Sequence, residues 1–179
     1  MDIRTYNKII LVGAGGSGKS WLAKRIAALT GYPLYHLDKE FWRPGWVMTP
    51  RDEKIARQNE IISGDKWIID GNYNSTLETR FAAADLIIYL DISRIVAIMS
   101  AAKRSGKKRS DLPDYLEEHT AFNKEFIQFA KWIWYYPKDG RKTIMDLHEK
   151  YPDKAFLRIK SRRAVKRMVR NWETKSMCS

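Results

Sequence analysis

The residues best suited to chemistry lie near the N-terminus, in the stretch GAGGSGKS that begins at Gly13 and ends at Ser20. Its glycine, lysine and serine positions have the spacing of a phosphate loop, whose glycines let backbone N–H groups approach a polyphosphate closely. Lys19 is expected to reach the β- and γ-phosphates of ATP as a catalytic cation, and the Ser20 hydroxyl to bind Mg²⁺. The residues predicted to bind the nucleotide here are Gly13, Gly15, Gly16, Ser17, Gly18, Lys19 and Ser20.

The segments on either side of this loop are the elements that a phosphate loop requires. Residues 9–12, IILV, form a continuous apolar run, typical of a strand buried on both faces of a parallel sheet. After the loop, Leu22, Ile26 and Leu29 recur at helical spacing until Gly31, which ends the helix. A helix that begins at the loop adds the positive end of its dipole to the phosphate site.

The rest of the chain alternates strands with helices, which predicts an α/β fold: a three-layer α/β/α sandwich around a mostly parallel sheet of five strands. Further apolar runs predict strands over 34–38, 67–71, 86–91 and 155–159. Thr49 as N-cap and Pro50 predict a helix that runs to Ile62, and a capping box of Ser75 and Glu78 predicts a short one. Other helices are expected over 95–102, 122–133 and 165–172.

Acids follow three of the predicted strands, at the sheet edge where ligands gather in such folds. Asp38 is a candidate base for the proton of an acceptor hydroxyl, and the alternative is a capping aspartate. Asp70 suits a water-mediated ligand of Mg²⁺, with Asp91 as its rival. Asp70 is favoured over Asp91 as this ligand because Gly71 directly follows it.

Composition limits the class of protein. A chain of 179 residues is expected to form one domain, and its net charge of +12 favours an anionic partner such as a nucleotide. The single cysteine, Cys178, excludes a disulfide framework and a cysteine-based metal site. The sequence has no apolar run long enough to span a membrane and no signal-like start, so a cytoplasmic protein is expected.

Several segments resemble a known family. The stretches HLDKEFWRPGW, WIIDGNYNSTLETR, KWIWYYPK and IKSRRAV are similar to the small bacterial group named DNA topology modulation proteins, which belongs to the kinase-like phosphate-loop ATPases. More widely, the chain resembles nucleoside-monophosphate-kinase-like enzymes, which implies the strand order 2-3-1-4-5, an acceptor-binding insertion at about 39–64 and a lid at about 103–113. Asn72 and Tyr73 stand where adenylate kinases carry an aromatic-Pro-Arg run, which argues against a standard nucleotide acceptor.

The segment FWRPGW, residues 41–46, falls in the implied acceptor-binding insertion. Its Pro-Gly turn could set Trp42 and Trp46 as walls of a pocket, with Arg43 binding an acceptor anion. The alternative is that both rings close a small core beneath the next helix. Arg80 could contact an acceptor phosphate or form a surface ion pair. The residues predicted to bind the acceptor are Asp38, Trp42, Arg43, Trp46, Gly71, Asn72 and Arg80.

Two basic segments have their own interpretations. Residues 103–109 surround Ser105-Gly106 with lysines and arginines, so Arg104 and Arg109 are predicted lid cations that close over the phosphates, unless the segment is a solvated loop. The resemblance implies that Ser161 and Arg162 border the adenine. The acid-free run 158–170 could bind a nucleic-acid backbone, but a solvated helix face is favoured.

The sequence as a whole favours an ATP- and Mg²⁺-dependent phosphotransferase that acts on a small acceptor. A nucleic-acid-associated NTPase that modulates DNA topology is the second interpretation, and a nucleotide-binding regulator without turnover is the third. The acceptor itself and the oligomeric state are left open.

Overall fold

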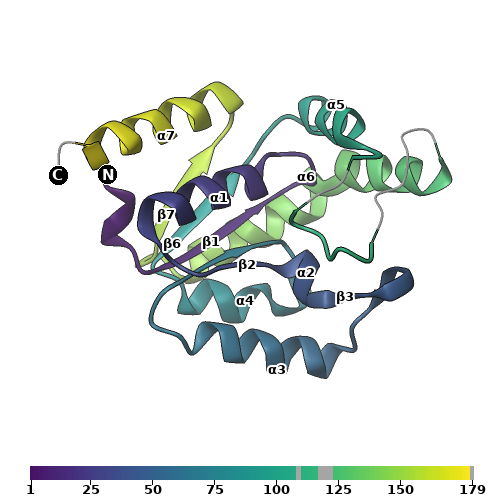
Figure 1. The fold of residues 1–179 in the computed structure, drawn as a ribbon, viewed down its shortest axis with the longest axis horizontal. Coiled ribbons are helices and arrows are strands. Elements are labelled where there is room, and N and C mark those ends of the chain that lie inside the picture. The colour runs from purple at the N-terminus through teal and green to yellow at the C-terminus, as the bar shows by residue number, and fades with distance from the viewer. Residues whose placement is uncertain (108–109, 117–122, 178–179) are drawn as a thin grey trace.

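A five-stranded parallel sheet forms the centre of the protein, in a computed structural model that describes residues 1–107, 110–116 and 123–177 (Figure 1). Its strands are β1 (Lys8–Gly13), β2 (Leu34–His36), β5 (Trp67–Asp70), β6 (Leu86–Leu90) and β7 (Ala155–Ile159). They lie in the order β2-β5-β1-β6-β7, and every pair is parallel. Numbered within this sheet alone, that order is 2-3-1-4-5, which confirms the expected arrangement.

Helices cover both faces of the sheet, as predicted. Helices α1 (Lys19–Thr30) and α7 (Arg162–Met177) pack on one face, around Ile9 and Leu11 of β1. The other face, around Ile10 and Val12, is covered by α3 (Arg51–Ile62), α4 (Asn74–Ala83), α5 (Arg94–Arg104) and α6 (Lys124–Lys150). The strands read as continuous apolar runs because both of their faces are buried. Among the described residues, no helix combines the length and apolar character that crossing a bilayer requires.

The segment between β2 and α3 forms a small hairpin of its own. It consists of α2 (Leu37–Phe41), β3 (Trp42–Arg43), the 3₁₀ turn η2 (Pro44–Trp46) and β4 (Val47–Met48), and a further 3₁₀ turn, η1 (Ile3–Thr5), precedes β1. The two hairpin strands are antiparallel, and the Thr49 N–H donates to the Phe41 carbonyl at 2.9 Å to close the hairpin base. The predicted cap at Thr49 is wrong, because α3 begins at Arg51 with Pro50 in the N-cap position.

The predicted capping box at Ser75 and Glu78 is also wrong. Helix α4 begins at Asn74, with Tyr73 in the N-cap position and no side-chain cap. Ser75 therefore lies inside the first turn, and the Glu78 carboxylate instead accepts hydrogen bonds from Lys150 and Tyr151 at the far end of α6. Between β5 and α4, the Asn72 side chain binds Gly13 of the phosphate loop.

An ion cluster at Asp91 joins β6, β7 and α6. The Asp91 carboxylate accepts from Arg158 Nε at 2.9 Å and Nη2 at 2.6 Å, and also from Arg141. Burial acts to raise the pKa of Asp91, but the hydrogen bonds and charges of the two arginines outweigh it and lower that pKa below its ordinary value. Asp91 is thus committed to holding the sheet edge together.

We expect Asp91→Asn to lower the free energy of unfolding by roughly 1–3 kcal/mol at neutral pH, because two arginines lose a charged partner. A carboxyl group with a lowered folded-state pKa contributes stability above its unfolded pKa, and loses it as the pH falls through the folded value. The difference from wild type should therefore shrink once the pH falls below about 4, as measured by urea unfolding at a series of pH values. Asp146→Asn, at an exposed pair with Lys142, is the control and should change stability by less than about 0.5 kcal/mol. A difference for Asp91→Asn that stays constant down to acid pH would contradict this role.

Candidate active site

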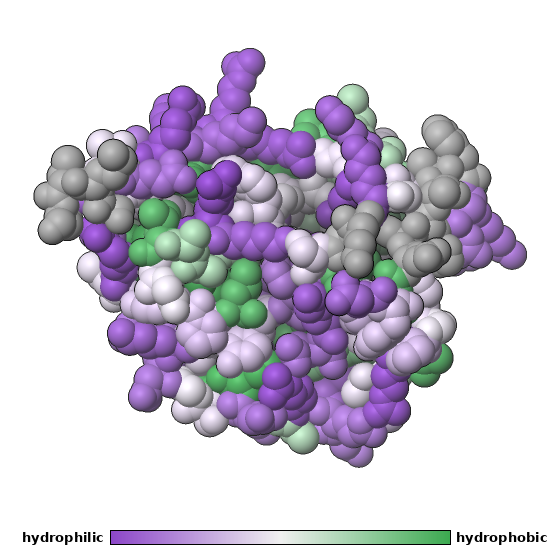
Figure 2. All heavy atoms as spheres, viewed as in Figure 1, coloured by the Kyte–Doolittle hydropathy of each residue, from purple (hydrophilic) through white to green (hydrophobic). Residues whose placement is uncertain are grey.

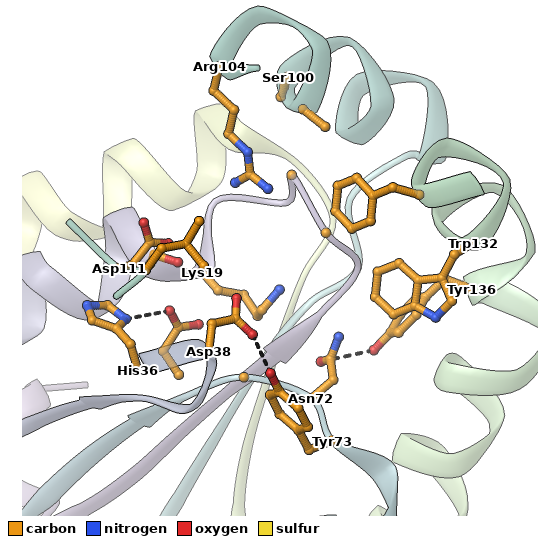
Figure 3. Close-up of a pocket in the computed structure, with 18 of the residues that line it drawn as sticks. Lys19, His36, Asp38, Asn72, Tyr73, Ser100, Arg104, Asp111, Trp132 and Tyr136 are labelled. Atoms are coloured by element: carbon orange, nitrogen blue, oxygen red, sulfur yellow. Dashed lines mark hydrogen bonds and ion pairs between the residues drawn. The ribbon is translucent and has the colours of Figure 1, made fainter. Parts of the chain in front are cut away.

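A cavity of about 1100 Å³ opens at the carboxyl edge of the sheet (Figure 3). The edge arises from strand register, since β2 and β5 pair His36 with Asp70, and β1 and β6 pair Gly13 with Leu90. The cavity is lined by the phosphate loop, the ends of β2 and β5, the tryptophan hairpin, the end of α5 and the first half of α6. Groups that are distant in the sequence therefore face one space.

The phosphate loop runs between β1 and α1 in close contact with its neighbours. At Gly13 (φ 144°) and Gly16 (φ 74°), an added Cβ would lie 2.5 Å from the Leu90 carbonyl oxygen and 2.2 Å from that of Ala97. Only glycine fits at these two positions. Helix α1 has Gly18 as its N-cap with no side-chain cap, which suits the N–H groups of its first turn to binding an anion. Of the predicted nucleotide-binding residues in this loop, Gly15, Gly16, Gly18, Lys19 and Ser20 line the cavity, whereas Gly13 and the buried Ser17 do not.

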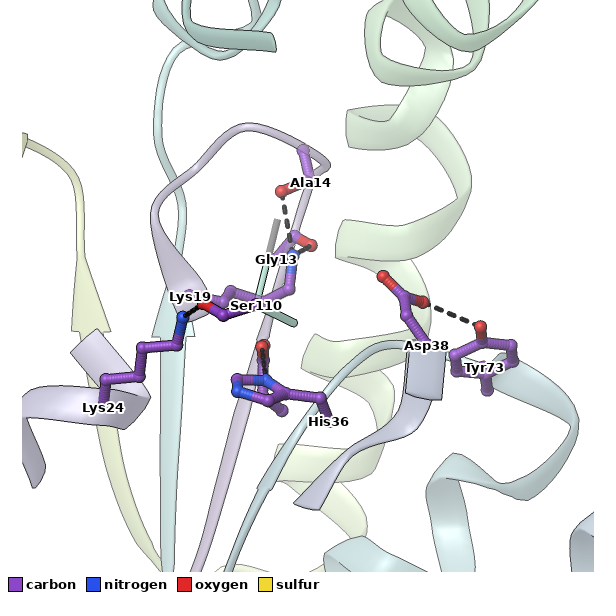
Figure 4. A network of polar contacts seen from close by, with 9 residues as sticks. Gly13, Ala14, Lys19, Lys24, His36, Asp38, Tyr73 and Ser110 are labelled. Atoms are coloured by element: carbon purple, nitrogen blue, oxygen red, sulfur yellow. Dashed lines mark hydrogen bonds and ion pairs between the residues drawn. The ribbon is translucent and has the colours of Figure 1, made fainter. Parts of the chain in front are cut away.

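Four cations lie around the loop. The Lys19 ammonium donates to the carbonyl oxygens of Gly13 at 2.8 Å and Ala14 at 3.0 Å, so it is folded over the loop (Figure 4). Arg162 Nη2 donates to the Gly16 carbonyl at 2.9 Å, and Lys24 and Arg104 also line the cavity.

Two further predicted residues, one at the adenine and one in the lid, do not line the cavity among the described residues. Ser161 does not line the cavity, because its hydroxyl accepts from the Ala164 N–H at 3.2 Å as the cap of α7. The predicted adenine contact is therefore reduced to Arg162. Arg109, the second predicted lid cation, lies outside the described residues.

The residues present fit a magnesium ion. His36 Nδ1 lies 2.9 Å from Asp70 Oδ2, and both side chains are buried, at 8% and 5% exposed. The other oxygen, Asp70 Oδ1, is buried with no hydrogen-bond partner described, in a cavity that Ser20 also lines. The described residues form no cluster of three or more histidine, cysteine or acidic ligands. A site with few protein ligands suits Mg²⁺, which keeps waters and takes phosphate oxygens as ligands.

His36 was missed in the sequence because histidine spacing alone gave no sign of a ligand. The feature that could have identified His36 is its position at the end of β2, next to Asp70 at the end of β5. Asp91, the rival metal ligand, does not line the cavity and is bound by the two arginines described above.

Asp38 lines the cavity from the first turn of α2. Its Oδ1 accepts a hydrogen bond from the Tyr73 hydroxyl at 2.7 Å (Figure 3). Burial, together with the neighbouring Asp38 charge, raises the pKa of Tyr73, so the phenol stays protonated and donates. The Tyr73 ring is itself held edge-on against Phe41, with ring centroids 4.8 Å apart. The carboxylate is thus oriented by a side chain from the neighbouring strand end.

The side chain of Asn72 binds the phosphate loop. Its Oδ1 accepts from the Gly13 N–H at 3.0 Å, and its Nδ2 donates to the Gly13 carbonyl at 2.7 Å. The Tyr136 hydroxyl of α6 donates to the same Oδ1 at 3.3 Å. The amide is engaged by these partners, but Asn72 also lines the cavity, as does Gly71 before it, so acceptor binding by both residues stays a prediction.

Both arginines predicted to bind an acceptor anion lie elsewhere. Arg80 is fully buried and donates to the Asn72 carbonyl and to Thr76 Oγ1 at 2.6 Å, and burial lowers its pKa. It supports the turn after β5 from beneath, so both interpretations of Arg80, acceptor contact and surface ion pair, are wrong. Arg43 forms an exposed ion pair with Glu53 and does not line the cavity, so its predicted contact is wrong too.

Aromatic rings form two walls of the cavity. Trp42 and Trp46 both line it, with ring centroids 5.4 Å apart. From α6, Phe129 and Trp132 stack at 5.7 Å, and Trp132 meets Tyr136 edge-on at 5.4 Å. Both stacked rings lie against the phosphate loop, because a Cβ on Gly15 would come within 2.5 Å of the Phe129 ring. No site role was predicted for the α6 wall, although KWIWYYPK is rich in aromatic residues.

No family model and no curated protein matches the chain. Solved structures do match in fold: a shikimate kinase from Acinetobacter baumannii in complex with shikimate is 12% identical, with 97% of this chain and 96% of that chain covered and a TM-score of 0.55. A shikimate kinase from Bacteroides thetaiotaomicron is 13% identical, with 94% and 97% covered and a TM-score of 0.56. A gluconokinase from Sinorhizobium meliloti is 14% identical, with 99% and 94% covered and a TM-score of 0.54. The chain has a P-loop kinase fold. At these identities the likeness concerns the fold alone.

Within this P-loop kinase fold, Asn72→Ala tests what holds the phosphate loop. Gly13 loses partners for both its N–H and its carbonyl, so we expect the free energy of unfolding to fall by roughly 1–3 kcal/mol and the affinity for an ATP analogue to fall with it. Thermal unfolding and calorimetric titration measure the two effects. Asn74→Ala is the matched control, because Asn74 lines the same cavity from the exposed start of α4. Equal losses in both variants would rule out a special role for Asn72.

Proposed function

We propose that this protein is an ATP- and Mg²⁺-dependent phosphotransferase that moves the γ-phosphoryl group of ATP to a hydroxyl group of a small acceptor. The observation that carries the proposal is that the Asp38 carboxylate and the Lys19 phosphate loop face one cavity. A kinase of this kind needs a phosphate cradle and a proton acceptor on opposite sides of the transferred group. The insertion at about 39–64 and the lid at about 103–113 belong to the same proposal.

The proposed reaction is a direct displacement. The acceptor oxygen forms a bond to the γ-phosphorus, the bond from that phosphorus to the β–γ bridging oxygen breaks, and the hydroxyl proton passes to Asp38. The products are ADP and the phosphorylated acceptor. Lys19, Arg104 and Arg162 would balance the negative charge on the phosphate oxygens, while Tyr73 holds Asp38 in position.

Ser20 and Asp70 would hold Mg²⁺, with Asp70 acting through water. When bound, the ion neutralises charge on the β- and γ-phosphate oxygens. His36 would orient the Asp70 carboxylate by binding Oδ2, while Oδ1 has no hydrogen-bond partner described. Arg104 lies at the start of the proposed lid and points from α5 toward the loop (Figure 3).

The names of the structural neighbours support a small hydroxyl compound as the acceptor. By their names, the structural neighbours act on shikimate and gluconate, which are small hydroxyl compounds. A kinase that phosphorylates a small hydroxyl compound is therefore the proposal for this chain. Membership of the DNA topology modulation group remains a proposal that rests on the sequence stretches quoted above.

The nucleic-acid alternative rests on the basic run 158–170, and that run is partly committed elsewhere. Arg158 binds Asp91 and Arg162 binds the Gly16 carbonyl. On the face drawn in Figure 2, hydrophilic side chains predominate along the upper edge, over α7. Besides Arg162, the exposed cations that this run places on α7 are Arg163, Lys166, Arg167 and Arg170. DNA-stimulated ATP hydrolysis that disappears when three of these are replaced would favour this alternative over the kinase.

We expect Lys19→Ala to reduce ATP turnover by roughly 10²-fold or more, because a cation on the transferred phosphate is lost. The measurement is ADP formation in a screen of small hydroxyl compounds, run with and without DNA. Lys39→Ala is the control, since Lys39 is exposed beside Asp38 but does not line the cavity. Turnover in Lys19→Ala equal to that of wild type would refute the phosphate-loop assignment.

Asp38→Asn should slow transfer to the acceptor by roughly 10²–10⁴-fold, because an amide cannot take the hydroxyl proton. Affinity for an ATP analogue should be nearly unchanged, so kcat falls while nucleotide binding persists. Tyr73→Phe, which leaves the carboxylate but removes its 2.7 Å donor, should give a smaller loss. If Asp38→Asn transfers at the wild-type rate to a proven acceptor, the residue is structural and the base lies elsewhere.

A further inference from the structure

Trp21 is a half-exposed tryptophan at the anion-binding end of α1. It directly follows Ser20 in the first turn of the helix and lines the same cavity as the phosphate loop. The residue keeps 42% of its surface exposed. A flat aromatic side chain therefore lies beside the N–H groups that would bind a phosphate.

The other tryptophans that line the cavity have ring partners of their own. Trp42 and Trp46 pack on each other in the hairpin, and Trp132 stacks on Phe129 of α6. The described ring contact of Trp21 is instead with a cation of its own helix. Trp21 is thus the lining tryptophan that belongs to α1, the helix that follows the phosphate loop.

The Trp21 ring is held by an arginine that reaches α7. The guanidinium of Arg25 lies over the ring, 5.4 Å from its centroid, and Arg25 Nη1 lies 3.9 Å from Glu173 Oε1 of α7. Helices α1 and α7 lie side by side on the same face of the sheet (Figure 1). An arginine thus covers one face of the ring, and the other face is the one that a ligand could use.

The start of α7 and the end of β2 define the two ends of the nucleotide site. Arg162, which begins α7, lines the cavity and donates from Nη2 to the Gly16 carbonyl at 2.9 Å. Asp38 follows β2, and β2 and β7 are the opposite edges of the sheet. Under the proposed function the γ-phosphate faces Asp38, so the nucleoside would extend away from it, toward Trp21 and Arg162.

We infer that Trp21 is the stacking platform for the base of the bound nucleotide. The inference rests on the proposed function and names the residue that recognises the nucleoside part of the phosphoryl donor. Anion-binding N–H groups beside an aromatic ring fit a ligand with a polyphosphate at one end and a flat ring at the other, as in a nucleoside triphosphate. The platform takes the role expected of Ser161, whose hydroxyl is engaged as the cap of α7.

The test compares a nucleotide with a polyphosphate that has no base. The probes are adenylyl imidodiphosphate and inorganic tripolyphosphate, each with Mg²⁺, and calorimetric titration measures their dissociation constants. We expect Trp21→Ala to weaken binding of the nucleotide by roughly tenfold or more, because the base loses its stacking surface. Affinity for tripolyphosphate should be nearly unchanged, since the phosphate loop is left intact. An equal loss for both probes, or no loss for the nucleotide, would overturn the inference.

Trp134→Ala is the matched control. Trp134 is also 42% exposed and also has an arginine over its ring, with the Arg94 guanidinium 3.9 Å from the centroid, but it lies on α6 outside the cavity. Its replacement should leave the affinity for both probes unchanged. A loss of nucleotide affinity in Trp134→Ala equal to that in Trp21→Ala would contradict a local role for Trp21.

Two further measurements test stacking itself. Trp21→Phe keeps an aromatic face and should retain most of the nucleotide affinity that Trp21→Ala loses. The guanosine counterpart of the nucleotide probe should lose affinity in Trp21→Ala by a similar factor, because every base has a face for stacking. A phenylalanine variant as weak as the alanine variant, or a loss confined to the adenosine probe, would contradict stacking at this residue.

The inference and the proposed function fail in different ways. If wild type phosphorylates a small hydroxyl compound but Trp21→Ala binds the nucleotide as tightly as wild type, the kinase proposal stands and the platform is wrong. If nucleotide binding depends on Trp21 but no compound supports ADP formation, the platform stands and the phosphotransferase proposal falls. If wild type binds neither probe, both are wrong.

Discussion

The pairing of the Asn72 side chain with Gly13 is the interaction on which the rest of the site depends. At Gly13 the chain leaves β1 with φ 144°, and one amide satisfies both the N–H and the carbonyl of this residue. Two further groups hold Asn72 in place: Arg80 donates to its main-chain carbonyl, and the Tyr136 hydroxyl of α6 donates to its side-chain oxygen. The phosphate loop is therefore bound to the chain directly after β5, the strand that ends in Asp70. This contact fixes the position of the phosphate loop relative to Asp70.

A fully buried arginine is an unusual means of support, because burying a charge is costly unless hydrogen bonds compensate it. Arg80 is compensated by Thr76 and by Gln58 of α3 as well as by the turn after β5. Arg80 thus supports the backbone of residues 71–73 from the interior and does not line the cavity.

Helix α6 connects the core to the cavity. Ile133, Ile144 and Leu147 pack in the core beneath the sheet, while Trp132 and Tyr136 face the phosphate loop. The aromatic wall is therefore anchored by the same helix that carries Arg141 to Asp91. Helix α6 thus contributes residues both to the sheet edge and to the wall of the site.

The sequence by itself determined the elements whose signals are local: the five strands and their buried faces, the phosphate loop and the helix that follows it, and Asp70 at the end of β5. Apolar runs and glycine spacing arise from neighbouring residues, so they can be interpreted without knowing the fold. Only the tertiary structure decided the partners of the polar side chains. His36 binds Asp70, 34 positions away in the sequence, and Asn72 binds Gly13, 59 positions away. The helix cap expected at Ser75 is absent, because α4 already begins at Asn74. Arg43 and Arg80 had suitable charge and position along the chain, but where a long side chain ends is set by packing between elements.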